Sequence, residues 1–193
     1  MGQYYKQAFK NNGTIYTCSR KVKGVDREMA KLMEHSWIGN YLMDSVAKYL
    51  YKNPTNLLWV GDYADGNDEV GEATNNDVAY TDVWGEEMKN EFEFELCKKF
   101  TYKGKFLVNH TKKQYLDFTT YIKNCEVKPY WSNRKMCINP ISLLTVIGNG
   151  RGGGDYCGMN EDSVGYWKWD LISIEDEKPE GFEPLNVSFI EGE

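Results

Sequence analysis

A glycine-rich stretch, residues 148–156, combines residue types that can hold an anion. It reads GNGRGGGDY, with five glycines around a single arginine. Successive backbone N–H groups in such a stretch can form a concave anion site, and a guanidinium can clamp a phosphate through two parallel hydrogen bonds. A structural alternative is open, in which the glycines permit a sharp crossover and Asp155 pairs with Arg151. The candidate ligand-binding residues of this stretch are Gly148, Asn149, Gly150, Arg151, Gly152, Gly153, Gly154, Asp155 and Tyr156.

The stretch also contains the pattern G-x-G-x-x-G, but its surroundings argue against the usual dinucleotide and P-loop sites. In a dinucleotide-binding fold a helix must follow the glycines, because its N-terminus carries the pyrophosphate. Here the sequence DYCGMNEDSVG follows, and it has no helical pattern. No Gly-Lys-Ser or Gly-Lys-Thr occurs in the chain. We therefore expect a different kind of anion site, if the stretch binds an anion at all.

Residues elsewhere in the chain would complete a nucleotide-like site. Aromatic rings stack on bases, so we expect Trp37, Tyr156 or Trp167 to contact a base. His35 and Asp62 would contact the sugar or the base edges. Each has a structural alternative: His35 as a histidine at the start of a helix, Asp62 as a turn cap, and the aromatic residues as core.

An enzymatic alternative uses the same pocket. His35 would act as general base, with Glu34 or Asp62 orienting it, and the enzyme would cleave a phosphoester or glycosidic bond. The other histidine, His110, is predicted to be a turn residue. No cofactor is predicted, and no metal, because the histidines, cysteines and carboxylates lack the spacing of known metal sites.

Charge is distributed unevenly along the chain. Residues 61–95 carry one basic and twelve acidic side chains, and residues 175–193 carry one and seven, within an overall net charge of −6. An acidic chain is a poor nucleic-acid binder, because phosphate neutralisation supplies most of that affinity. A second functional alternative is therefore an acidic protein inhibitor that docks on a basic partner protein surface through residues 61–95.

The cysteines and the apolar residues indicate a compartment. The five cysteines are widely spaced and none forms a C-x-x-C pair, which predicts reduced thiols in a cytoplasmic protein. The N-terminal residues lack the apolar core of a signal peptide, and no apolar run is long enough for a membrane span. The aromatic content, 15%, would suit a homo-oligomer interface.

Local patterns in the first half of the chain predict a hairpin, a helix and a strand. Residues 2–10 and 13–21 flank an Asn-Asn-Gly turn, which favours a β-hairpin. Residues 56–66 are predicted to form a short buried strand, and residues 65–81 an exposed loop. Spacing by four favours a helix over 82–100, although EFEFEL within it alternates like a strand. An apolar face formed by Ile38, Leu42, Val46 and Leu50 predicts a helix that begins at Asn40 or Ser36 and ends before Pro54.

The second half is predicted to be mostly strands. Residues 103–118 are expected to form two strands around an HTKK turn, and 119–125 a short helix or loop. Residues 135–150 contain a β-rich apolar run that ends in the glycine loop, residues 164–176 are expected to form a strand, and residues 185–190 an edge strand. Because strands outnumber helices and do not alternate with them, we expect an α+β fold with a mainly antiparallel sheet and about two helices packed on it. Residues 1–175 would form a single domain, and residues 176–193 an acidic C-terminal tail.

Several motifs together resemble an uncharacterised family of small bacterial and phage proteins. They are MGQYYK, KLMEHSWIGN, WVGDYAD, FLVNHTKKQY, GNGRGGGDY and VGYWKWDLISIE. The family has no established activity, so the resemblance assigns no residue a role and implies only a setting, that of a phage-type accessory protein in a host cytosol. Such proteins commonly counter host defence, by sequestering a nucleotide signal or by blocking a host protein partner. The leading hypothesis is therefore sequestration of a small anionic, nucleotide-like ligand.

Overall fold

The computed structural model describes residues 2–18, 29–64, 83–84, 91–92, 95, 97–129 and 132–190. Within these ranges helices pack on one mixed, mainly antiparallel sheet, so the predicted α+β class is confirmed. The described strands are β1 (Tyr5–Asn11), β2 (Thr14–Cys18), β3 (Thr55–Gly61), β4 (Glu91–Phe92), β5 (Phe106–Asn109), β6 (Gln114–Asp117), β7 (Val146–Ile147), β8 (Leu171–Glu175) and β9 (Glu183–Pro184). The helices include α1 (Leu32–His35), α2 (Tyr41–Leu50), α4 (Phe118–Cys125), α5 (Pro140–Leu144) and the 3-10 turn η1 (Glu161–Ser163).

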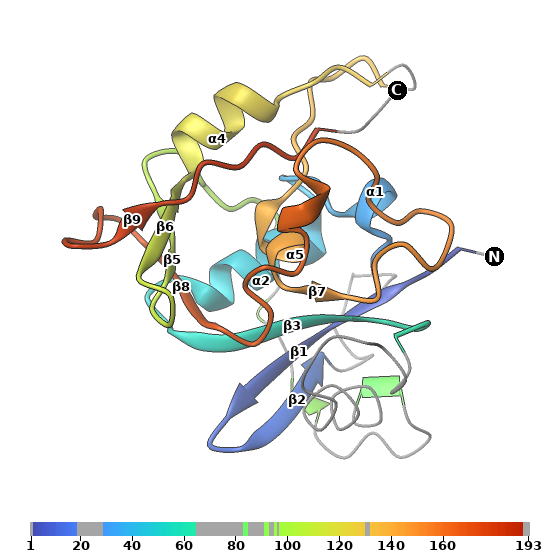
Figure 1. The fold of residues 1–193 in the computed structure, drawn as a ribbon, viewed down its shortest axis with the longest axis horizontal. Helices are drawn as coiled ribbons and strands as arrows, with labels where there is room; N and C mark the ends of the chain where they lie inside the picture. The colour runs from blue at the N-terminus through green and yellow to red at the C-terminus, as the bar shows by residue number, and fades with distance from the viewer. Residues whose placement is uncertain are drawn as a thin grey trace.

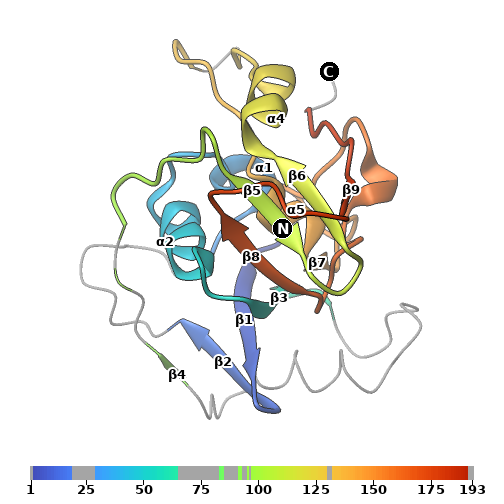
Figure 2. The same ribbon diagram turned by 90° about the vertical axis from the view of Figure 1, so that its left-hand side faces the viewer.

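Strand β3 connects the two halves of the sheet, whose strand order is β4-β2-β1-β3-β8-β5-β6-β9. One edge of β3 pairs antiparallel with β1. The other edge is shared, because β8 pairs beside Thr55 and Asn56 whereas β7 pairs beside Trp59 and Val60. In Figure 1, β1 to β3 run below α2 and α5, and β5, β6 and β8 stand at the left. Figure 2 shows the same two groups of strands from the side, so the sheet bends around α5.

The elements with strong local signals form as predicted. Asn12 and Gly13 adopt positive φ and turn β1 into β2, and β5 pairs with β6 around the HTKK turn. The side chain of Asn40 accepts a hydrogen bond from the backbone N of Leu42 at 2.9 Å, so Asn40, not Ser36, is the N-cap of α2. Helix α4 forms where a short helix or loop is predicted.

The prediction of a β-rich run within residues 135–150 is wrong over most of that range. Helix α5 occupies its centre, and β7 is only two residues long. Asn139 caps α5 by accepting from the backbone N of Ile141 at 3.0 Å, and Pro140 suits the first turn because that position needs no N–H. Every residue of α5 is buried, so its apolar residues form no stripe that distinguishes a helix from a strand.

The strand predicted at 164–176 is confined to β8. Residues 164–169 form turns, with positive φ at Gly165 and Trp169. The backbone N of Trp167 donates to the Leu144 carbonyl at 2.6 Å, and that of Trp169 donates to the Leu57 carbonyl at 3.1 Å. These bonds to α5 and β3 take the place of a regular strand ladder.

The helix predicted at 82–100 is not continuous. Val83 and Trp84 are helical, but Glu91–Phe92 forms β4, which pairs parallel with β2, and residues 97–100 are not helical. The remaining positions of this span, and the loop predicted at 65–81, lie outside the described residues.

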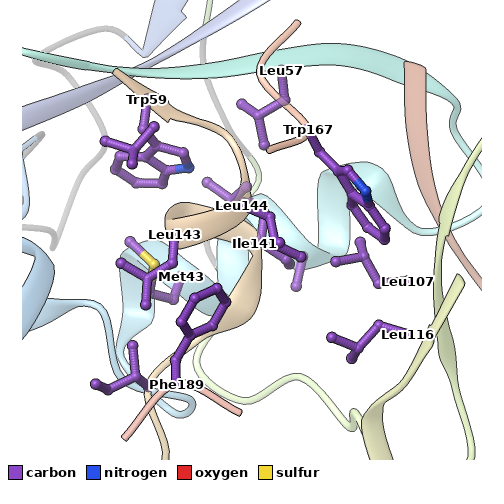
Figure 3. Close-up of a cluster of buried hydrophobic side chains, with 14 of the residues drawn as sticks. Met43, Leu57, Trp59, Leu107, Leu116, Ile141, Leu143, Leu144, Trp167 and Phe189 are labelled. Carbon is purple, nitrogen blue, oxygen red and sulfur yellow. The ribbon is translucent and has the colours of Figure 1, made fainter. Parts of the chain in front are cut away.

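The main core lies between the sheet and the helices, with α5 at its centre (Figure 3). The labelled side chains are Met43, Leu57, Trp59, Leu107, Leu116, Ile141, Leu143, Leu144, Trp167 and Phe189. The predicted edge strand at 185–190 is replaced by β9, which comes earlier in the chain and pairs parallel with β6. Beyond β9, Val187 and Phe189 are buried in this core. Among the described helices, none is long and apolar enough to cross a membrane.

Candidate functional site

The glycine loop, residues 148–156, follows β7 and is held from two sides. The backbone N of Gln3 donates to the Gly153 carbonyl at 2.9 Å, and the backbone N of Met33 donates to the Gly154 carbonyl at 3.1 Å. The loop therefore lies between the N-terminal segment and α1, which are far from it in sequence. This arrangement brings the helix that carries His35 next to the glycines.

Asp155 satisfies the backbone of the loop from within. Its Oδ2 accepts from the backbone N of Arg151 at 2.7 Å and of Gly152 at 2.8 Å. Its Oδ1 accepts from the hydroxyl of Tyr5 at 2.5 Å. The carboxylate therefore accepts hydrogen bonds from two of the backbone N–H groups that the sequence suggests as donors to an anionic ligand. The sequence predicts that Asp155 pairs with Arg151; in the structure Asp155 accepts from the backbone N of Arg151, and Arg151 Nη1 donates to the Tyr63 carbonyl.

Close packing and backbone conformation account for several of the glycines. A Cβ added at Gly148 would lie 2.7 Å from the Cβ of Ala64, and one at Gly152 would lie 2.6 Å from the Cβ of Gln3. Gly150 has open space at that position but a φ of 91°, which a residue with a Cβ rarely adopts. The structural alternative therefore explains much of the glycine content.

Arg151 is the exposed cation of the loop. Its Nη1 donates to the Tyr63 carbonyl at 3.0 Å, which orients the guanidinium against the segment that follows β3. The backbone of Arg151 is fixed at the same time by Asp155. An arginine held at both ends in this way is a directed hydrogen-bond donor at the protein surface.

Asp62 and Tyr5 add two ionisable groups beside Asp155. The Asp62 carboxylate accepts from the backbone N of Tyr4 at 3.1 Å. Burial raises the pKa of Asp62; the Tyr4 hydrogen bond lowers it, and the nearby charge of Asp155 raises it. Burial also raises the pKa of Tyr5 far above its ordinary value, and the hydrogen bond to Asp155 adds to this. Tyr5 is therefore a fixed neutral donor.

The hydrogen bonds of α1 count against general-base chemistry at His35. His35 Nδ1 accepts from the backbone N of Lys31 at 3.1 Å, which places the proton of a neutral ring on Nε2. The Glu34 carboxylate pairs with Lys31 Nζ at 2.7 Å. In this arrangement neither ring nitrogen is ready to take a proton from a substrate.

The three aromatic residues proposed to stack on a base lie inside the protein. Trp37, Tyr156 and Trp167 have 3%, 1% and 0% of their surfaces exposed. Tyr156 is fixed by Asn149, which both accepts from its backbone N at 2.8 Å and donates to its carbonyl at 3.0 Å. A ligand on the surface of the loop would not reach these rings, so their burial supports the core alternative.

A recess of about 290 Å³ adjoins the loop. Gly148 and Asn149 form one side of it, and Glu161, Gly165 and Lys168 lie around the rest. Its volume is at the small end of ligand sites, which are roughly 300–1,000 Å³. It is large enough for a phosphate or a sugar. Within the described residues no group of three His, Cys, Asp or Glu side chains could hold a metal.

His110, which lies in the predicted turn, is surrounded by a polar cluster that the sequence did not predict. Its Nε2 is 2.8 Å from the hydroxyl of Ser173, and this hydroxyl donates to Glu175 at 2.6 Å. Because the serine proton points to Glu175, His110 donates to the serine and does not activate it as a nucleophile. Burial lowers the pKa of His110, and the charge of Glu175 opposes this. The sequence shows that Ser173 and Glu175 are alternate residues of the predicted strand, but it does not show that this strand pairs with β5.

No model of a known protein family matches the chain, and no curated protein or solved structure shows significant similarity to it. The resemblance to small bacterial and phage proteins therefore stays a prediction from the motifs. Most of the acidic segment at 61–95 lies outside the described residues.

Proposed function

We propose that the chain binds a small phosphate-bearing, nucleotide-like ligand at the glycine loop and holds it without turnover. Arg151 carries this proposal, because its exposed side chain extends from a braced loop and is oriented by the Tyr63 carbonyl. A preoriented guanidinium loses less conformational freedom on binding a phosphate than a flexible one does.

Contacts within the loop define how the ligand would sit. Because Asp155 already accepts hydrogen bonds from two backbone N–H groups of the loop, the phosphate would bind the Arg151 side chain rather than the backbone. The recess beside Gly148 would take the adjoining sugar, with Lys168 at its edge as a second cation. Asp62 would accept a hydrogen bond from a sugar hydroxyl or a base amino group, as the sequence predicts.

Sequestration fits the site better than hydrolysis does. His35 Nδ1 accepts from the backbone N of Lys31, which places the proton of the neutral ring on Nε2. The Glu34 carboxylate pairs with Lys31. A binding protein needs no general base, so this arrangement is compatible with binding. Sequestration of a nucleotide is also the role that a phage-type accessory setting would favour.

Native mass spectrometry with a panel of nucleoside monophosphates, diphosphates and cyclic nucleotides tests the proposal. The bound ligand is released by heat and identified. We expect one class of ligand to bind and to be recovered intact. Recovery of a cleaved product would favour the hydrolase alternative. Failure to bind any member of the panel would overturn the proposal and favour a protein partner for residues 61–95.

A further inference from the structure

A cleft of about 550 Å³ opens beside β6, and its described lining includes no residue of the glycine loop. Residues 184–188 form one part of this lining, and Thr120 and Asn124 of α4 form another. The backbone N of Leu185 donates to the Tyr115 carbonyl at 2.7 Å, which holds the C-terminal segment against β6. The volume is well within the range of ligand sites, roughly 300–1,000 Å³, so the cleft can hold a small molecule.

Strands β5 and β6 give the cleft an aromatic wall. Phe106 and Asp117 are directly opposite each other in the two strands, and Tyr115 is two residues before Asp117. Because side chains alternate between the faces of a sheet, all three lie on the same face. The rings of Phe106 and Tyr115 pack edge to face with their centroids 5.8 Å apart. Leu185 also lines the cleft, so the body of a ligand would meet mainly apolar surface here.

Two opposite charges line the same cleft. Asp117 and Lys178 are the charged side chains among its described lining residues. Lys178 Nζ lies 5.2 Å from the centroid of the Tyr115 ring, which places the ammonium beside the aromatic wall. In the part of the chain that the structure describes, neither residue forms an ion pair. Asp117 accepts from the backbone N of Thr119 and the hydroxyl of Thr120, each at 2.8 Å, and a carboxylate has about four acceptor sites.

The arrangement of these charges indicates the class of ligand. Alternate residues of a strand have Cα atoms roughly 7 Å apart, so a molecule that packs on Tyr115 can meet both Asp117 and Lys178. A nucleotide or another anion would gain from Lys178 but would be repelled by Asp117. A neutral sugar would bring neither charge. A zwitterion with an apolar body matches the carboxylate, the ammonium and the aromatic wall together.

We propose that this cleft binds a free amino acid with an aromatic or large apolar side chain. The carboxylate of the amino acid pairs with Lys178, and its ammonium pairs with Asp117. Its side chain packs on Phe106 and Tyr115. The site is separate from the glycine loop and does not depend on phosphate binding there.

Amide NMR spectra of the full-length protein, titrated with L-phenylalanine at neutral pH, test this inference. We expect saturable shifts at residues of the cleft. The ligand 3-phenylpropionate lacks the ammonium and phenethylamine lacks the carboxylate, so each should bind about 10- to 100-fold more weakly, as expected for the loss of a charge-assisted hydrogen bond. Absence of binding by L-phenylalanine and L-leucine would overturn the proposal. Equal binding of the singly charged ligands, or binding of glucose instead, would overturn it too.

Variants of the two charged residues locate the site. Lys178→Met keeps a long side chain over Tyr115 without its charge, and Asp117→Asn removes the other charge but keeps a residue that can cap α4. Each should weaken binding of L-phenylalanine about 10- to 100-fold. Lys128→Met is the matched control, since Lys128 is exposed and outside the described lining, and it should change nothing.

Circular dichroism shows whether the variants fold, and Asp117→Ser, which also retains a capping side chain, replaces Asp117→Asn if that variant does not. Unchanged affinity in the folded variants of Lys178 and Asp117 would contradict the proposal. An equal loss in Lys128→Met would contradict it as well.

Discussion

At the scale of single residues, Asp155 organises the glycine loop, because its carboxylate accepts from the backbone N of Arg151 and Gly152 and from the hydroxyl of Tyr5. Its place in GNGRGGGDY marks an acidic side chain close to several backbone N–H groups, and Asp commonly binds backbone N–H groups nearby in sequence. The hydrogen bond from Tyr5 could not be predicted, because it depends on how β1 approaches the loop. Arg151 could be recognised as a candidate, but its contact with the Tyr63 carbonyl could not.

Asp155→Ala should destabilise the protein by about 1–3 kcal/mol, because it leaves the Tyr5 hydroxyl and two backbone N–H groups without their acceptor. Urea unfolding followed by tryptophan fluorescence measures this change. Asp162→Ala is the matched control, since Asp162 is exposed in η1 and should be nearly neutral on substitution. Equal stabilities of the two variants would contradict the role assigned to Asp155.

His110 should titrate below its ordinary pKa of 6.5, because burial disfavours its charged form. The unfolded chain then binds the proton more tightly than the folded chain. His110 therefore contributes stability above pH 6.5 that is lost as the pH falls through the lower pKa of the folded state. Histidine signals in an NMR titration, assigned with His110→Gln, measure this directly. A value above 6.5 would show that Glu175 outweighs burial.

At the scale of elements, prediction succeeded where the signal is local. The Asn-Gly turn and the cap and apolar face of α2 each lie within a few neighbouring residues. Prediction failed for α5 and for residues 164–169, because their conformations depend on burial and on hydrogen bonds to distant elements. The burial of Trp167 likewise follows from that tertiary setting.

Substitution by alanine should destabilise the protein more at Gly148 than at Gly150. Both have positive φ, so each substitution introduces backbone strain of about 1–2 kcal/mol. Only at Gly148 would the new Cβ also meet a neighbour, Ala64, and overpacking adds roughly 1–3 kcal/mol. Thermal unfolding of Gly148→Ala and Gly150→Ala should therefore show the larger loss at Gly148. A larger loss at Gly150 would contradict the packing that we assign to the loop.

At the scale of the whole molecule, distant parts of the chain build the loop and the core together. The segment before β1, helix α1 and the residues after β3 all contact the glycine loop. The sequence supplied most of the candidate residues, but it could not bring them together, because no local pattern encodes these contacts. The acidic C-terminal segment illustrates the same limit, since Phe189 near its end is fully buried.

Phe189→Ala should therefore lower the free energy of unfolding by about 3–5 kcal/mol, as expected for removing a buried aromatic ring. Leu185→Ala, in the same segment but only half-buried, should have a smaller effect. Chemical denaturation of both variants measures the difference. If Phe189→Ala unfolds like the wild-type chain, the C-terminal segment does not contribute to the core.

The central claim is that Arg151 holds the phosphate of a nucleotide-like ligand. Isothermal titration calorimetry of wild type, Arg151→Ala and Arg134→Ala tests it, using the nucleotide that mass spectrometry identifies as bound. Arg134 is also exposed but lies outside the loop, so its variant removes the same charge elsewhere. We predict a roughly 10- to 100-fold weaker affinity for Arg151→Ala, as expected for a charge-assisted hydrogen bond, and no change for Arg134→Ala. Equal affinities of the two variants would contradict the claim.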